Sequence, residues 1–227
     1  ASELSLKCIP GIELSVTEEG KLLHLLGFQI DVTNTHFLEA LRVQTETRKQ
    51  FFVEYIPLLN EKLLAKNLAI LDQNLYQQKD ETYFCGPGLV RFMKESGVIS
   101  DTEQGFSLVS GMPKFSFPCS VKTGIELIHK AGGLAVFSHP LAPRISLKNF
   151  SEDRAVWRNL IATYKKDGLD GVELSHTGHS DEENSLLAEW AKELDLGVTF
   201  GSDWHGTVEQ TGESIKNYLP YYTSEFN

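Results

Sequence analysis

This chain of 227 residues contains few cysteines and no long apolar run. The three cysteines, Cys8, Cys85 and Cys119, are odd in number, far apart and in no Cys-x-x-Cys spacing. This excludes a disulfide framework and predicts reduced thiols in a cytoplasmic protein. No apolar run approaches the ~20 residues that a membrane-spanning helix needs, and no basic-then-apolar leader is present. We therefore expect a cytoplasmic protein with no membrane partner.

Basic side chains are also fewer than acidic ones. The 21 Lys and Arg residues against 31 Asp and Glu residues give a formal net charge of −10. High-affinity binding of extended duplex nucleic acid needs clustered positive charge, so this class of function is disfavoured. A nucleotide or short oligonucleotide held through metal ions stays compatible with the composition, because bound cations change the local charge. The hydrophobic share of 41% is that of an ordinary globular protein.

The second half of the chain repeats one pattern, in which a helix leads through glycine into a short apolar strand. The pattern occurs three times, at 121–138, 153–175 and 181–202. Such units predict an α/β fold with parallel strands. Earlier, two apolar runs at 8–16 and 22–29 flank Glu18-Glu19-Gly20 and predict a hairpin. Helical spacing follows from residue 35 to about residue 66, with Pro57 expected to kink or divide the helix.

Polar residues that can bind a metal gather at the ends of these strands. His139 ends the first strand of the repeating pattern, and Asp203 and His205 end the third. Glu13 and His24 stand inside the apolar runs of the hairpin, where a charge or an imidazole is costly unless it is paired or ligated. Parallel strands bring their carboxyl ends to one edge, so the residues at the ends of these strands are expected to converge. Whether Glu13 and His24 are cross-strand neighbours depends on the register of the hairpin. Carboxylate and imidazole ligands suit Mn, Fe or Zn.

Each of these residues also has a simpler interpretation. A single buried histidine is more often a hydrogen-bonded core residue than a ligand. Glu13 alone is equally explained by pairing with an arginine, and His139 by capping a strand before Pro140. The combination of one Glu, one Asp and three His at strand ends or inside buried strands favours the metal hypothesis.

Five motifs in order resemble the PHP (polymerase and histidinol phosphatase) domain family, from about residue 9 to residue 206. They are Gly-Ile-Glu-Leu-Ser at 11–15, Leu-His-Leu-Leu-Gly-Phe at 23–28, Gly-Gly-Leu-Ala-Val-Phe-Ser-His-Pro at 132–140, Gly-Leu-Asp-Gly-Val-Glu-Leu at 168–174 and Gly-Ser-Asp-Trp-His-Gly at 201–206. The branch that they resemble contains metal-dependent phosphoesterases acting on nucleoside 3′,5′-bisphosphates and short oligonucleotides. The resemblance implies a distorted (β/α)7 barrel, formed by residues 1–66 and 120–227, with a small helical insertion at 67–119.

The resemblance also implies roles for individual residues. It implies one to three divalent ions, with the metal ligands Glu13, His24, His139, Asp203 and His205. Arg144 resembles an arginine that contacts substrate phosphate, and His179 resembles a histidine at the rim of the active site. We expect Arg144 and His179 to act in catalysis, and His205 or His179 to protonate the leaving group.

Two departures from the family pattern leave alternatives open. The family begins with a His-x-His strand and an Asp-His-Asp-Thr-like segment, and neither is found here, so the barrel is expected to be N-terminally incomplete. The insertion of the family carries Arg-Pro-His where this chain has Gly86-Pro87-Gly88; Arg91 is a candidate substitute. The alternative to an active hydrolase is a catalytically impaired binding or structural module. A third hypothesis, an amidohydrolase-like barrel, lacks a ligating Lys or a His-x-His near the first strand.

Overall fold

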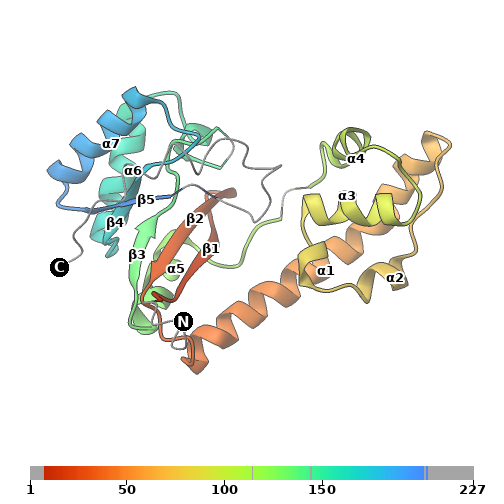
Figure 1. Ribbon diagram of the computed structural model, residues 1–227, viewed down its shortest axis with the longest axis horizontal. Helices are drawn as coiled ribbons and strands as arrows, with labels where there is room; N and C mark the ends of the chain where they lie inside the picture. The colour runs from red at the N-terminus through yellow and green to blue at the C-terminus, as the bar shows by residue number, and fades with distance from the viewer. Residues whose placement is uncertain (1–7, 114, 144, 202, 204–227) are drawn as a thin grey trace. The chain divides into compact units, whose positions relative to one another are not determined.

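The computed structural model describes residues 8–113, 115–143, 145–201 and 203 (Figure 1). The chain divides into two compact units, Ala1–Phe37 with Pro118–Asn227, and Leu38–Phe117. The predicted insertion at 67–119 falls almost wholly inside the second unit, which also includes most of the preceding long helix. The assignment of these units to a barrel and an insertion stays a prediction.

The first unit is built on a mixed five-stranded sheet with the strand order β1-β2-β3-β4-β5. Its strands are β1 (Gly11–Glu18), β2 (Lys21–Phe28), β3 (Leu134–Phe137), β4 (Gly171–Ser175) and β5 (Gly197–Phe200). The pairs β1/β2 and β2/β3 are antiparallel, whereas β3/β4 and β4/β5 are parallel. The α/β class is confirmed by this mixed sheet and its helices.

The predicted hairpin is confirmed, and its turn explains its register. Glu19 and Gly20 both have positive φ, at 48° and 72°, as a tight two-residue hairpin turn requires. The pairing places Glu13 opposite Leu26, and Ser15 opposite His24. Glu13 and His24 are therefore diagonal neighbours on one face, where long side chains can meet. The apolar residues of the hairpin face the core, with Leu14, Val16 and Leu25 at most 2% exposed.

The three helix–strand units are also confirmed. Helices α5 (Val121–Lys130), α6 (Arg154–Lys166) and α7 (Asp181–Glu193) precede β3, β4 and β5. Helix α5 packs closely on the hairpin, since a Cβ on Gly124 would lie 2.8 Å from Val16 and 2.9 Å from Leu25. In Figure 1, α5, α6 and α7 lie beside the sheet of the first unit. Because β3, β4 and β5 run in parallel, their carboxyl ends share one edge.

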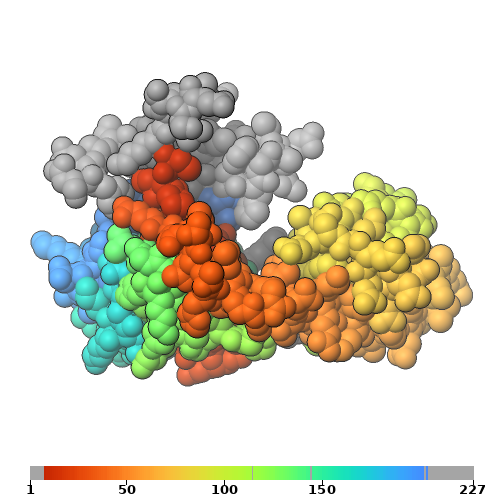
Figure 2. Space-filling view, turned by 90° about the horizontal axis from the view of Figure 1, so that it is seen from below, coloured from red at the N-terminus to blue at the C-terminus, as the bar shows by residue number. Residues whose placement is uncertain are grey.

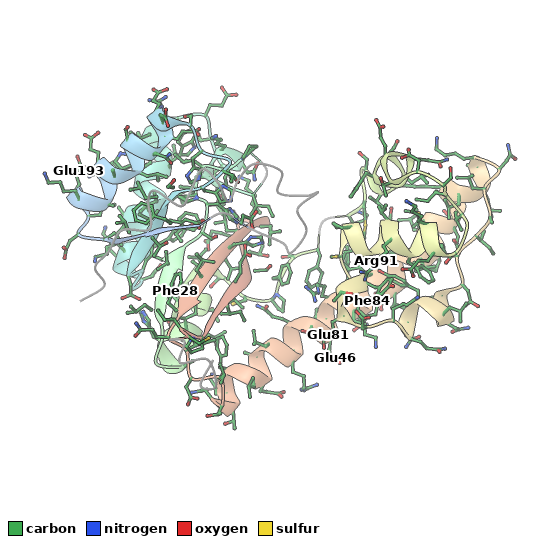
Figure 3. All side chains as sticks on the ribbon, in the orientation of Figure 1. Phe28, Glu46, Glu81, Phe84, Arg91 and Glu193 are labelled. Carbon is green, nitrogen blue, oxygen red and sulfur yellow. The ribbon has the colours of Figure 1, made fainter. Side chains whose placement is uncertain are left out.

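The second unit is helical. It contains most of α1 (Thr35–Ala65), followed by α2 (Gln73–Gln77), the 3-10 turn η2 (Glu81–Tyr83), α3 (Gly86–Glu95) and α4 (Thr102–Val109). Figure 2 shows α2, α3 and α4, in yellow and yellow-green, gathered against the orange α1. Tyr76, Phe84 and Met93 are at most 1% exposed in their shared core. Figure 3 labels Phe84 and the exposed Arg91 in this unit.

Pro57 lies inside α1 and does not divide it, so of the two predicted outcomes, a kink or a division of the helix, the division is wrong. A proline inside a helix leaves the carbonyl four residues earlier without its usual amide donor. Here that carbonyl belongs to Val53, and the side-chain amide of Gln73 donates to it at 3.0 Å. None of the helices in the described part of the chain is long and apolar enough to cross a membrane.

Candidate metal centre

Three of the predicted ligands meet at the carboxyl edge of β3. Glu13 comes from β1, His24 from β2, and His139 lies two residues beyond the end of β3. The backbone amide of Ser138 donates to the His24 carbonyl at 3.1 Å, which continues the β2/β3 ladder to this edge. Phe28, labelled in Figure 3, marks the opposite end of β2.

The ligand atoms of these three side chains lie within 4.8 Å of one another. Oε1 of Glu13 is 2.6 Å from Nδ1 of His24 and 3.3 Å from Nε2 of His139. The two imidazole nitrogens are 3.1 Å apart. Glu13, His24 and His139 are called the triad below.

The electrostatics of the triad favour an ionised carboxylate. Hydrogen bonds from His139 and His24 hold the pKa of Glu13 well below its usual range, against the effect of burial. Burial alone would lower the pKa of His139, but the hydrogen bond and charge of Glu13 outweigh it and raise this pKa. Within the triad, the ionised carboxylate of Glu13 therefore faces the imidazoles of His24 and His139. A metal cation could bind all three side chains.

The tautomer of His139 supports the fit of a metal ion. Its Nδ1 lies 3.1 Å from the carbonyl oxygen of Ile145, which can only accept, so Nδ1 carries the proton. Nε2 shares its proton with Glu13, and loss of that proton to a binding cation leaves a neutral ring whose Nε2 lone pair can ligate the ion, as in metal sites whose histidines are oriented by a second hydrogen bond. Ligands at ~2.1 Å from a tetrahedral ion lie ~3.4 Å apart, so small shifts accommodate a divalent cation.

The backbone of His139 is strained. Its φ is +29°, in the left-handed region that favours glycine, and Pro140 follows it. Such a conformation costs about 1–3 kcal/mol and persists only where surrounding contacts hold it. Strain of this kind often occurs at functional sites, so the backbone of His139 is a site feature that sequence reasoning did not predict.

Beyond the triad, Asp203 is linked to His139 through His176. The His176 ring centroid lies 5.3 Å from that of His139, and His176 Nε2 lies 3.7 Å from Oδ2 of Asp203. Asp203 follows β5 and approaches the same edge, as the parallel strands predicted. His176 accepts from the backbone amide of Gly178 at 2.9 Å through Nδ1. From the sequence, His176 was one of the polar residues able to bind a metal at the end of the second strand of the repeating pattern, but no specific role was predicted for it.

His179 is held by the main chain at both ring nitrogens. Its Nδ1 lies 3.2 Å from the Leu174 carbonyl, and its Nε2 accepts from the Leu141 amide at 3.2 Å. Burial lowers the pKa of His179. This arrangement suits a neutral imidazole that joins two loops. The catalytic role expected for His179 stays a prediction, and these contacts favour a positioning role instead.

Glu173 is a second site residue to which sequence reasoning assigned no role. It is 4% exposed on β4, and its Oε2 accepts from the backbone amide of His139 at 2.7 Å and from Ser138 Oγ at 3.3 Å. Burial raises the pKa of Glu173. The signal was present in the sequence, because Glu173 stands inside the apolar run Gly-Val-Glu-Leu just as Glu13 stands inside its own.

Two predicted site residues, Arg144 and His205, lie outside the described residues. Their expected roles in phosphate contact and metal binding stay predictions.

Comparison with known proteins places the chain among phosphoester-cleaving enzymes. It is 31% identical over 216 residues to the 5′-3′ exoribonuclease of Haemophilus influenzae, covering 90% of this chain and 72% of that protein. It is 23% identical to the 3′,5′-nucleoside bisphosphate phosphatase of Chromobacterium violaceum, covering 92% of this chain and 71% of that protein. A solved structure from Bifidobacterium adolescentis, assigned as a metal-dependent phosphoesterase, aligns with a TM-score of 0.67 at 27% identity, covering 90% and 70% of the two chains. No protein-family model matches the chain.

A carboxylate and two imidazoles that converge at the carboxyl edge of an α/β sheet fit the class of metal-dependent hydrolases. The chain belongs to the family of the H. influenzae exoribonuclease, and it is an enzyme that hydrolyses phosphate esters with the help of metal ions. The expectation of a metal-dependent phosphoesterase is thereby confirmed.

Proposed function

We propose that this enzyme is a PHP-type phosphoesterase that hydrolyses phosphate esters of nucleotides or short oligonucleotides. The observation that carries the proposal is the triad, in which Glu13 Oε1, His24 Nδ1 and His139 Nε2 face one another within 4.8 Å. The names of its relatives support the substrate class, since one acts on RNA and another on nucleoside bisphosphates. The net charge of −10 favours a metal-mediated contact with such a substrate over a basic groove.

We propose that the triad binds one divalent cation, Mn, Fe or Zn, and that Asp203 and His205 hold up to two more. When bound, such ions polarise phosphoryl oxygens and lower the pKa of water toward about 7. The chain itself contributes the ionised carboxylate of Glu13 and the oriented lone pair of His139 Nε2. Arg144 would neutralise charge on the phosphate, and His179 or, if it holds no ion, His205 would donate a proton to the leaving group. A distorted (β/α)7 barrel with a helical insertion remains the proposed architecture.

The test is a turnover assay on the purified chain with Mn²⁺. The substrates are a 5′-phosphorylated single-stranded RNA oligonucleotide, adenosine 3′,5′-bisphosphate and an aryl phosphate ester. We expect metal-dependent release of mononucleotide or phosphate from at least one nucleotidic substrate, in preference to the aryl ester. Glu13→Ala and His24→Ala should abolish this turnover, whereas Glu18→Ala on the same strand should not change it.

Turnover that persists after chelation of the metal, or that is retained by both triad variants, would contradict the proposal. Preferential hydrolysis of the aryl ester would overturn the substrate class while leaving the reaction class in place.

A further inference from the structure

A buried carboxylate that no role yet explains lies directly behind the triad. Glu173 is 4% exposed, and a carboxylate in such surroundings is costly unless its oxygens are hydrogen-bonded. Glu173 Oε2 accepts from the amide of His139 at 2.7 Å and from the hydroxyl of Ser138 at 3.3 Å, and both donors belong to the segment that follows β3. The carboxylate therefore binds the main chain of a metal ligand rather than the ligand atom itself.

On its other side, the carboxylate of Glu173 lies close to the backbone of Gly201, which directly follows β5. A Cβ on Gly201 would lie 2.2 Å from Oε1 of Glu173, so the carboxylate occupies the space that a side chain at residue 201 would need. The β4/β5 pairing also shifts register between Glu173 and Ser175. Irregularities of this kind are common beside active sites, where they redirect a side chain. The carboxylate of Glu173 thus lies between the segments that follow β3 and β5.

His139 needs such an anchor more than an ordinary residue does. Its φ of +29° is unfavourable for a residue with a Cβ, and Pro140 restricts it further. The hydrogen bond from His139 Nδ1 to the Ile145 carbonyl orients the ring, and the Ala142 amide donates to the His139 carbonyl at 3.1 Å, but neither bond holds the His139 amide. The bond from the His139 amide to Glu173 opposes that relaxation, because it holds the peptide group that sets φ.

The same strand offers a matched comparison at its other end. Asp170, next to the start of β4, accepts from the backbone amide of Ala135 at 2.7 Å. This is the same kind of carboxylate-to-amide bond onto β3, made at the edge of the sheet remote from the triad. Asp170 also pairs with His129 Nε2 at 2.8 Å. Its loss should weaken the fold without moving the metal ligands.

We propose that Glu173 is a positioning residue that holds the metal ligand His139 in its strained backbone conformation by accepting its amide hydrogen. The proposal rests on the proposed metal site and adds a residue to it. This role requires a hydrogen-bond acceptor on a side chain as long as that of Glu at residue 173. A neutral acceptor of that length should hold the His139 amide, whereas a shorter carboxylate should not. Outer contacts of metal ligands typically change metal affinity 10–100-fold when they are removed.

The experiment is a titration of the chain with Co²⁺, followed by its visible absorption, with His24→Ala as the reference for signal that does not depend on the triad. Glu173→Met, which keeps side-chain length but removes the acceptor, should weaken Co²⁺ binding ~10–100-fold. Glu173→Asp should weaken it too, because its carboxylate is one methylene short. Glu173→Gln should stay much closer to the wild type than to Glu173→Met.

Asp170→Ala is the control, and it should lower the melting temperature while leaving Co²⁺ affinity unchanged. If circular dichroism shows that Glu173→Met does not fold, Glu173→Asp and Glu173→Gln still compare a misplaced acceptor with a correctly placed one. Wild-type affinity in Glu173→Met or Glu173→Asp would overturn the proposal. A loss in Glu173→Gln as large as in Glu173→Asp would also overturn it, because charge or direct ligation would then be responsible. Failure of the wild-type chain to bind Co²⁺ would refute the metal site itself.

Discussion

A divalent cation should stabilise the first unit against thermal unfolding, and Glu13→Ala should remove this effect. Glu13 supplies one of the three ligand atoms, and its side chain is 37% exposed, so its removal leaves no core cavity. A ligand at 100 times its dissociation constant that binds only the folded state contributes about 2.7 kcal/mol. At ~2–4 °C per kcal/mol for a chain of this size, the expected shift in the melting temperature is ~5–10 °C.

Tryptophan fluorescence is a suitable assay, because all three tryptophans of the sequence fall within the first unit. Two of them, Trp157 and Trp190, are 7% and 5% exposed. The shift should appear for the wild type and for the control Glu18→Ala, and it should be absent or small for Glu13→Ala at the same concentration of Mn²⁺. An equal shift in Glu13→Ala would refute the reasoning, since the ion would then bind elsewhere.

Three further substitutions test other parts of the structure. Burial alone would raise the pKa of Glu183, but Lys148 and the capping box of α7 hold it below its usual value. Ionised Glu183 therefore stabilises the folded state at pH values above its pKa in the unfolded chain. This stabilisation is lost as the pH falls through the lower pKa that Glu183 has in the folded chain. Glu183→Ala should cost ~1 kcal/mol in urea denaturation at neutral pH and almost nothing in strong acid. His179→Ala leaves a buried main-chain amide and a carbonyl unpaired and should cost ~1–3 kcal/mol of unfolding free energy; a large fall in kcat with unchanged stability would instead favour proton transfer by this residue. Gly201→Ala should weaken Co²⁺ binding, because its Cβ would lie 2.2 Å from Glu173 and displace the carboxylate; wild-type affinity would show that Glu173 tolerates the shift.

The sequence predicted those features that depend on local pattern. The hairpin and the three helix–strand units follow from apolar periodicity and from Gly20, and the place of His139 at the carboxyl edge follows from the parallel strands. The diagonal placement of Glu13 and His24 needed the register, which the two-residue turn sets. Charged or imidazole groups inside apolar runs were the decisive signal.

Features that depend on tertiary packing could not be predicted in this way. The integrity of α1 at Pro57 depends on Gln73, a residue sixteen positions further along the chain, whose amide reaches the carbonyl of Val53. The backbone strain at His139 arises from several loops meeting at one edge and leaves no mark in composition. Glu173 was predictable in principle by the argument used for Glu13, but its contact with the main chain rather than with a ligand atom was not.

The most direct test of the metal site is a crystal structure of the chain soaked in Mn²⁺, with anomalous data collected near the manganese edge. We predict an anomalous peak within ~2.3 Å of Glu13 Oε1, His24 Nδ1 and His139 Nε2. Full manganese occupancy elsewhere on the chain, with no anomalous density between these three atoms, would contradict the account.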